Sequence, residues 1–197
     1  MRVAIDIRRI NEFGVGTYTR NAIRTLARLD NFNEYFLLGI PGKLGDIEPL
    51  PDNFITVPTH PNEFSLNSYL ELNRILKQHR CDLLHVPHLF WKPQSVPCPY
   101  VVTVHDLLDH LYKVNSASWM KRQLHFEFTK RVLLRAARIF AVSNFSKQDT
   151  ERLFAVPGNR IEVIYNALDD RFRQGQDRKS TRLNSSHSGE SRMPSSA

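Results

Sequence analysis

The run from Arg138 to Asp170 constrains the fold of this chain more than any other segment. An apolar strand predicted over Ile139–Val142 leads into the polar pair Ser143–Asn144, and an amphipathic helix follows. A second strand, predicted over Ile161–Tyr165, ends at Asn166. Two strands joined by a helix, each ending in small polar residues, are typical of a parallel sheet whose ligand lies beyond the carboxyl ends of the strands.

The preceding residues show the same alternation of short apolar runs and amphipathic segments. This alternation predicts βαβ units and therefore an α/β fold, a Rossmann-like, doubly wound parallel sheet. For the last helix we expect Ser146 as the N-terminal cap, with Asp149 three residues on. The other predicted strands are Val3–Ile7, Tyr35–Ile40, Phe54–Thr59, Leu83–Val86 and Tyr100–His105, and the other predicted helices are Thr17–Leu29, Ser65–His79 and Trp119–Ala137.

The last residues, Asp177–Ala197, differ in character from the rest of the chain. Back-translated, Asp177–His187 resembles one end of a sequencing-library adapter, and Ser191–Ala197 resembles the other end in the same frame. A natural Ser-rich disordered tail is the alternative. We favour the adapter origin, expect this tail to be disordered, and leave it out of the predictions of fold and function.

Charge and composition narrow the classes of function. Without the tail, the 27 basic and 20 acidic residues become 23 and 18, so the net charge is +5 instead of +7. No basic run is interleaved with aromatics as in a nucleic-acid interface, and the two cysteines form no disulfide framework. The N-terminus is a charged strand rather than a signal peptide, and no apolar stretch is long enough to span a bilayer. The cytoplasm is the expected compartment.

The sharpest candidate site is His105 with Asp106, at the end of a predicted strand rich in β-branched residues. Such a strand holds the imidazole rigidly at the ligand edge, where Asp106 can orient it or cap the next segment. A buried histidine bonded to a backbone carbonyl explains the same pattern equally well. Both interpretations stay open from the sequence alone.

Other polar residues follow the predicted strands. Gly14 and Gly16 precede a helix and allow close approach of a phosphate, although a glycine turn that only joins strand to helix is the alternative, and Thr19 replaces the third glycine of a dinucleotide fingerprint. For Arg8 and Arg9 we favour a solvated strand end over a phosphate contact. The histidines at 85 and 88 flank a proline and lack a third ligand nearby, so no metal site is expected.

The longest predicted helix combines basic and aromatic residues. Such a face can rest on anionic lipid, but a solvated face over a core stripe is the interpretation we favour. Peripheral contact with the inner face of a membrane stays open as the alternative. The residues concerned are Lys113, Lys121, Arg122, Lys130, Arg131 and Arg135 with Trp119, Phe126 and Phe128.

Three segments together carry a family resemblance: GVGTYTRN from Gly14, PYVVTVHDLLDH from Pro99, and the run Arg138–Asp170. They resemble the N-terminal, acceptor-side domain of GT-B-fold glycosyltransferases of the retaining family 4. Within that family they look most like bacterial mannosyltransferases that act on polysaccharide or lipid-linked glycans. The resemblance implies such a domain over residues 1–170, the start of a hinge over 171–176, and a nucleotide-sugar domain that this chain lacks.

The resemblance also implies roles for single residues. His105 and Asp106 would be catalytic, beside the transferred sugar, and Gly14 and Gly16 would face the donor diphosphate. The cleft would be lined by Tyr18, Ser143, Asn144 and Asn166. The family needs no metal or other cofactor, and its partners are a nucleotide-sugar donor, bound mainly by the missing domain, and a glycan or lipid-linked acceptor. The fragment by itself is expected to be inactive.

Two other classes of function stay open. One is half of a sugar-nucleotide epimerase, which can share the GT-B architecture, although the extra carboxylates expected at its cleft are not evident. The other is a non-enzymatic phosphate- or nucleotide-binding Rossmann-like module. A second βα domain with two spaced glutamates after Gln176 would decide for the glycosyltransferase.

Overall fold

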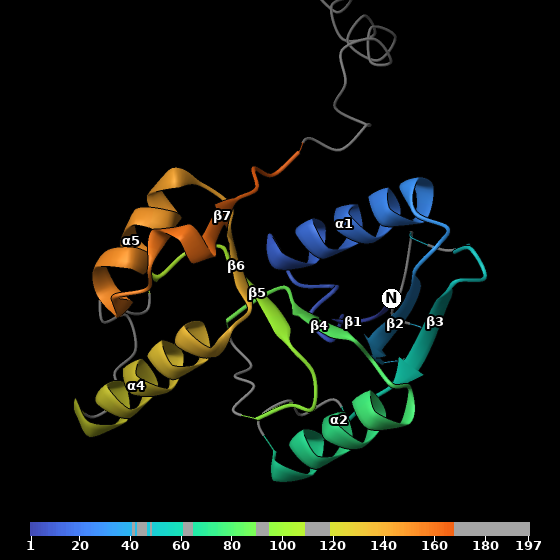
Figure 1. Ribbon diagram of the computed structural model, residues 1–197, viewed down its shortest axis with the longest axis horizontal. Coiled ribbons are helices and arrows are strands. Elements are labelled where there is room, and N and C mark those ends of the chain that lie inside the picture. The colour runs from blue at the N-terminus through green and yellow to red at the C-terminus, as the bar shows by residue number, and fades with distance from the viewer. Residues whose placement is uncertain are drawn as a thin grey trace, which may run out of the picture. The chain divides into compact units, whose positions relative to one another are not determined.

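The computed structural model describes residues 1–40, 42, 47, 49–60, 65–89, 95–108 and 119–167. Residues 168–197, which include the predicted hinge and the predicted tail, lie outside the described residues. Residues Met1–Asn166 form one structural unit. Its described part contains a seven-stranded sheet made of β1 (Arg2–Asp6), β2 (Glu34–Gly39), β3 (Phe54–Pro58), β4 (Leu83–Val86), β5 (Tyr100–Val104), β6 (Arg138–Ala141) and β7 (Ile161–Val163) (Figure 1).

All neighbouring strands of the sheet are parallel, in the order β3-β2-β1-β4-β5-β6-β7. This arrangement confirms the predicted Rossmann-like, doubly wound α/β fold. The chain runs outward from β1 to β2 and β3, and then returns to place β4 on the other side of β1. In such sheets ligands bind beyond the carboxyl ends of the strands, near the point where the strand order reverses. We call these strand ends the carboxyl edge.

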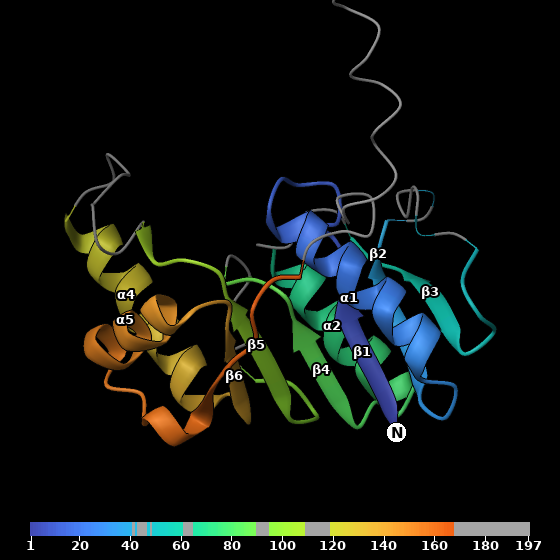
Figure 2. The same cartoon turned by 90° about the horizontal axis from the view of Figure 1, so that it is seen from above.

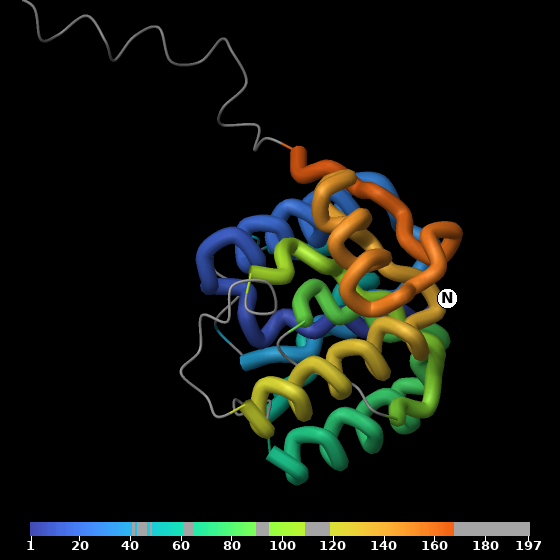
Figure 3. Tube along the Cα trace, turned by 90° about the vertical axis from the view of Figure 1, so that its left-hand side faces the viewer, coloured from blue at the N-terminus to red at the C-terminus, as the bar shows by residue number. Residues whose placement is uncertain are grey.

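Helices cover both faces of the sheet (Figures 2 and 3). One face packs against α1 (Val15–Leu29). The other packs against α2 (Leu66–Gln78), α4 (Trp119–Arg135) and α5 (Asn144–Phe154). A short 3₁₀ helix, η2 (Gly158–Arg160), precedes β7. Among the described residues, no helix is long and apolar enough to cross a membrane.

Alternation along the central strands explains the two layers. In β1, Ala4 belongs to the core under α2, α4 and α5, whereas the next residue, Ile5, belongs to the core under α1. Successive side chains of a strand point to opposite faces, so a strand covered by helices on both faces is apolar along most of its length. The same holds for β2, where Phe36 and Leu37 divide between the two cores.

One prediction at the start of the last helix is wrong. Helix α5 begins at Asn144, and its cap is Ser143, whose Oγ accepts a hydrogen bond from the backbone N–H of Ser146 at 3.0 Å. The two serines lie three residues apart, so either could have served as the cap. Asp149 does not take part in this cap; its Oδ1 accepts from the Arg152 guanidinium at 2.9 Å.

The solvated strand end predicted at Arg8 is also wrong. Its side chain is only 5% exposed and forms an ion pair with Asp6, 2% exposed, at 2.6 Å. A second nitrogen of Arg8, Nη1, donates to Ser68 Oγ at 2.9 Å. Because Asp6 ends β1 inside the structure, its charge requires a buried partner, and Arg8 is drawn inward to supply it.

Candidate functional site

His105 follows directly after β5 and is partly buried at the carboxyl edge. Its Nε2 lies 2.8 Å from the carbonyl oxygen of Pro87, which follows β4. A carbonyl can only accept, so Nε2 carries the proton, and Nδ1 is the acceptor of the neutral ring. Burial lowers the pKa of His105, opposed by the bond to Pro87 and by the charge of Asp106. The ring is therefore neutral at neutral pH.

Tyr18, the fourth residue of α1, packs against the His105 ring. The two ring centroids lie 5.0 Å apart with the planes at 85°, an edge-on contact. Tyr18 also meets the ring of His85 edge-on at 6.5 Å. Its hydroxyl lies 3.2 Å from Thr103 Oγ1, and burial raises its pKa, opposed by that bond. The structure thus brings two predicted site residues into contact, Tyr18 of α1 and His105 directly after β5.

His85, in β4, continues this polar cluster toward the point where the strand order reverses. Its Nε2 lies 2.9 Å from Thr103 Oγ1. Burial, together with His88 and His105, lowers the pKa of His85 to about 4, although Asp6 opposes the shift. This imidazole is therefore neutral at neutral pH. Among the residues that the structure describes, no three His, Cys, Asp or Glu side chains are grouped as a metal site.

The two predicted phosphate-facing glycines have different surroundings. Gly14 is exposed, has φ 68° and precedes the first residue of α1, so it makes a turn that favours glycine. Gly16 is buried, and a Cβ there would lie 2.3 Å from the carbonyl oxygen of Ile10. The N–H groups of Val15 and Gly16 donate to Phe13 and Glu12. Close packing of α1 thus explains Gly16, and the diphosphate role of both glycines stays a prediction.

Ser143 is held at the carboxyl edge by its role as a cap. Since Ser146 Oγ donates to the carbonyl oxygen of His105 at 2.9 Å, the 3.0 Å contact between the two hydroxyls is donated by Ser143. These bonds connect the start of α5 to His105, the residue that follows β5. Ser143 thus helps to hold the backbone of His105 in place through Ser146. Its predicted contact with a ligand is a separate role.

The remaining predicted site residues are exposed. Asn144 donates from Nδ2 to the hydroxyl of Tyr165 at 2.9 Å, and Asn166 follows in the chain. Asp106 caps the segment after β5, because its Oδ1 accepts from the backbone N–H of Leu108 at 3.2 Å. It affects His105 through its charge.

Sequence reasoning missed Thr103 and Pro87 as parts of the site. Thr103 lies two residues before His105, so period-two alternation places both on the same face of β5. That signal was available. The contact between the Pro87 carbonyl and His105 could not be predicted in this way, because it depends on which strand lies next to β5.

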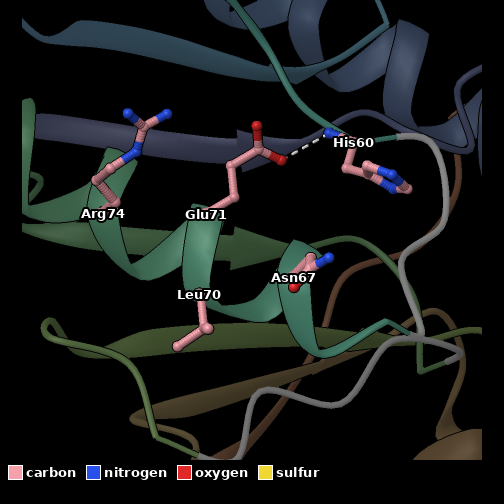
Figure 4. Close-up of a pocket in the computed structure, with 5 residues that line it drawn as sticks. All are labelled: His60, Asn67, Leu70, Glu71 and Arg74. Atoms are coloured by element: carbon pink, nitrogen blue, oxygen red, sulfur yellow. Dashed lines mark hydrogen bonds between the residues drawn. The ribbon is translucent and has the colours of Figure 1, made fainter.

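A pocket of about 360 Å³ lies elsewhere, against α2 and the segment after β3 (Figure 4). Glu71 Oε2 accepts there from the backbone N–H of His60 at 2.8 Å. None of the predicted site residues lines this pocket, so the candidate site is the cluster at the strand ends. The lining residues are His60, Asn67, Leu70, Glu71 and Arg74.

Comparisons with solved structures agree with this fold. A glycosyltransferase from Rickettsia africae ESF-5 is 15% identical, with a TM-score of 0.55 over 85% of this chain and 43% of that one. Alr3699/HepE from Anabaena, in complex with UDP and glucose, is 17% identical, with a TM-score of 0.58 over 86% and 45%. The lipopolysaccharide outer core galactosyltransferase WaaB, in its apo form, is 15% identical, with a TM-score of 0.55 over 85% and 46%. The chain spans less than half the length of each.

No curated protein matches this chain in sequence. The family model for Glycosyltransferase Family 4, in contrast, matches residues 14–172. That range contains most of the sheet and every residue of the candidate site, from Gly14 to Asn166. The chain therefore belongs to Glycosyltransferase Family 4.

Proposed function

We propose that this chain is the acceptor-side half of a retaining hexosyltransferase. The whole enzyme would transfer mannose or a similar hexose from a nucleotide sugar to a polysaccharide or lipid-linked glycan. The observation that carries the proposal is His105, whose Nε2 lies 2.8 Å from the Pro87 carbonyl oxygen at the carboxyl edge of a family 4 domain. Two similar structures support it, one solved with UDP and glucose and one named as a lipopolysaccharide galactosyltransferase.

In the proposed reaction, the acceptor hydroxyl attacks the anomeric carbon, the bond to the diphosphate breaks, and the acceptor proton leaves with the diphosphate. His105 Nδ1 accepts a hydrogen bond from a hydroxyl of the transferred sugar and so fixes its orientation. A neutral imidazole suits this task, because it accepts a hydrogen bond without adding a positive charge beside the sugar, which itself becomes positive in the transition state. The N-terminus of α1, with its partial positive charge, lies at the same edge and favours the departing diphosphate.

The proposal is tested by comparing two proteins with the same panel of nucleotide sugars and glycan acceptors. The 197-residue chain is expected to transfer no sugar, because orienting donor against acceptor contributes on the order of 7–11 kcal/mol and the proposed donor domain is absent. The chain extended by a family 4 donor domain is expected to release nucleoside diphosphate and form a glycoside with the anomeric configuration retained. Turnover by the short chain, or epimerised nucleotide sugar as the product of the long one, contradicts the proposal.

We also propose that α4 makes peripheral contact with an anionic membrane, on the cytoplasmic side. Part of the helix packs inward, since Phe126 stacks on Phe154 at 4.9 Å. Several apolar side chains nevertheless remain exposed beside the basic ones: Trp119 and Met120 at 71% and Leu124 at 57%. Apolar side chains interleaved with Lys and Arg suit the interface of an anionic bilayer. Lys113, from the original prediction, lies outside the described residues.

Sedimentation with vesicles tests this contact. Each Lys or Arg near an anionic surface contributes about 1 kcal/mol, so replacing Lys121 and Arg122 by Gln should weaken partition by roughly 30-fold. The control is Arg74→Gln with Lys77→Gln on α2, which removes the same charge and should not change partition. Equal binding to neutral and anionic vesicles, or equal losses in the two double variants, contradicts the contact.

A further inference from the structure

Tyr18 lies between His85 in β4 and His105 directly after β5, and these two strands are neighbours in the sheet. Its ring meets His105 edge-on at 5.0 Å and His85 edge-on at 6.5 Å. Its hydroxyl is turned to Thr103 Oγ1, which also contacts His85 Nε2. The hydroxyl is therefore occupied inside the protein, and the part of Tyr18 that touches the candidate site is the ring.

We propose that Tyr18 is a positioning residue: it holds the His105 imidazole against the Pro87 carbonyl, so that Nδ1 is the ring atom offered to the ligand. The proposal deepens the function proposed above and rests on it for the identity of the ligand, a sugar hydroxyl. The positioning itself can be measured without a ligand. The expectation that Tyr18 lines the cleft stays a prediction beside this role.

Three anchors hold His105 in place. The backbone carbonyl of His105 accepts a hydrogen bond from Ser146 Oγ at 2.9 Å, which holds the backbone from which the imidazole projects. Nε2 donates to Pro87 at 2.8 Å, which sets the tautomer. The edge-on contact with Tyr18 fixes the ring plane, since aromatic pairs favour this geometry. Without the tyrosine ring, the imidazole can turn away from Pro87 while its backbone stays fixed.

Tyr18 can serve as an anchor because it is anchored itself. It projects from α1, whose close approach to the preceding loop depends on Gly16. Its hydroxyl is held by Thr103, which is 1% exposed, and Thr103 in turn contacts His85. A partly buried chain of hydrogen bonds thus connects Tyr18 of α1 to Thr103 of β5 and His85 of β4.

The test is nuclear magnetic resonance of the His105 ring nitrogens in the 197-residue chain, free of ligand. In the wild-type protein we expect the neutral ring with its proton on Nε2. Tyr18→Leu is expected to shift the ring resonances of His105 and to populate both tautomers. Tyr18→Phe retains the aromatic ring and is expected to restore the wild-type tautomer. This rescue separates positioning of His105 from a general loss of packing.

Tyr35→Leu is the matched control. Tyr35 also has a hydrogen-bonded hydroxyl, but it is buried, lies on β2 and stacks on Phe54 at 4.4 Å. The control should destabilise the protein without changing the His105 signals. A proton on Nδ1 in the wild type, or His105 signals that respond equally to Tyr18→Leu and Tyr35→Leu, overturns the proposal.

A second variant covers the case in which Tyr18→Leu does not fold. Tyr18→Met keeps a long apolar side chain at this position and removes the aromatic ring that contacts His105. It is expected to produce a second set of His105 ring signals, and unchanged signals overturn the proposal. The readout needs no sugar transfer. If no sugar transfer is found but the Nε2–H tautomer and its dependence on Tyr18 are observed, the positioning role of Tyr18 is retained. Only the sugar hydroxyl as the ligand of Nδ1 is then rejected.

Discussion

Replacing His105 by alanine in the two-domain enzyme is expected to lower kcat by roughly 100-fold or more. This is the scale of losing a positioned group that acts in the transition state. His105 is suited to that role because Pro87 fixes its Nε2 as a donor and leaves Nδ1 as an acceptor at the carboxyl edge. The measurement is steady-state kinetics of sugar transfer, with kcat and KM determined separately.

The same substitution also removes the hydrogen bond to Pro87, so a smaller effect on stability is expected. One lost hydrogen bond costs about 1 kcal/mol, and the matching fall in Tm is a few degrees. The control is His79→Ala, which removes a partly buried histidine packed on Phe36 at 4.7 Å, at the opposite end of β4. It should lower Tm by a similar amount and leave kcat unchanged. A His105→Ala enzyme that is destabilised but has near-normal kcat would remove His105 from the site.

Replacing Asp6 by asparagine is expected to destabilise the chain by about 3–5 kcal/mol, the cost of leaving one charge of a buried ion pair without its partner. The carboxylate of Asp6 accepts two bonds from the Arg8 guanidinium, from Nε at 2.9 Å and from Nη2 at 2.6 Å, and neither side chain is more than 5% exposed. Asparagine keeps the shape of Asp6 and removes the charge. Urea unfolding of the 197-residue chain measures the difference.

A neighbouring ion pair provides the matched control. Arg9 and Glu12 lie 2.8 Å apart, but Glu12 is 50% exposed, so Glu12→Gln should cost no more than about 1 kcal/mol. Adding Arg8→Met to Asp6→Asn should recover part of the loss, because the uncompensated cation is then gone. If Asp6→Asn costs no more than Glu12→Gln, the buried pair does not stabilise the fold.

The pH dependence of stability gives a second signature of Asp6. Burial alone would raise its pKa, but the hydrogen bonds and charge of Arg8, with His88, outweigh burial and hold the pKa below the ordinary value of 3.8. The ionised form is thus favoured by folding, and its contribution is complete above the unfolded-state pKa. That contribution is lost as the pH falls through the lower folded-state pKa. The difference in the free energy of unfolding between the wild type and Asp6→Asn should therefore be constant near neutral pH and shrink only in strong acid.

The strands and helices of this fold are predictable from the sequence because their signals are local. Apolar runs and helical periodicity give β4 with the same bounds as observed, Leu83–Val86, and α4 within two residues of its end at Arg135. The alternation of the two kinds of element also predicts that the sheet is parallel. Ser143 and Ser146 show the limit of such signals: two possible caps three residues apart leave the start of the helix undecided.

The candidate site is less predictable because its contacts join distant segments. His105 is located by its place at the end of a strand, but its partners Pro87 and Tyr18 come from β4 and α1. They become its neighbours only because β4 lies between β1 and β5. Arg8 was misplaced for a related reason, since its burial depends on Asp6 and on Ser68 of α2, sixty residues away in the chain.

The strand order also determines how long one edge of β1 stays unpaired while the chain is being synthesised. Val3 of β1 pairs with Leu83 of β4, so one edge of β1 has no native neighbour until some eighty further residues have been synthesised. At roughly 5–20 residues per second, that interval is on the order of 4–16 s. During it, β1, β2 and β3 can pair with one another, while the other edge of β1 presents open N–H and C=O groups. An open apolar edge is a template for pairing with another chain, so crowded synthesis of this protein favours aggregation before β4 emerges.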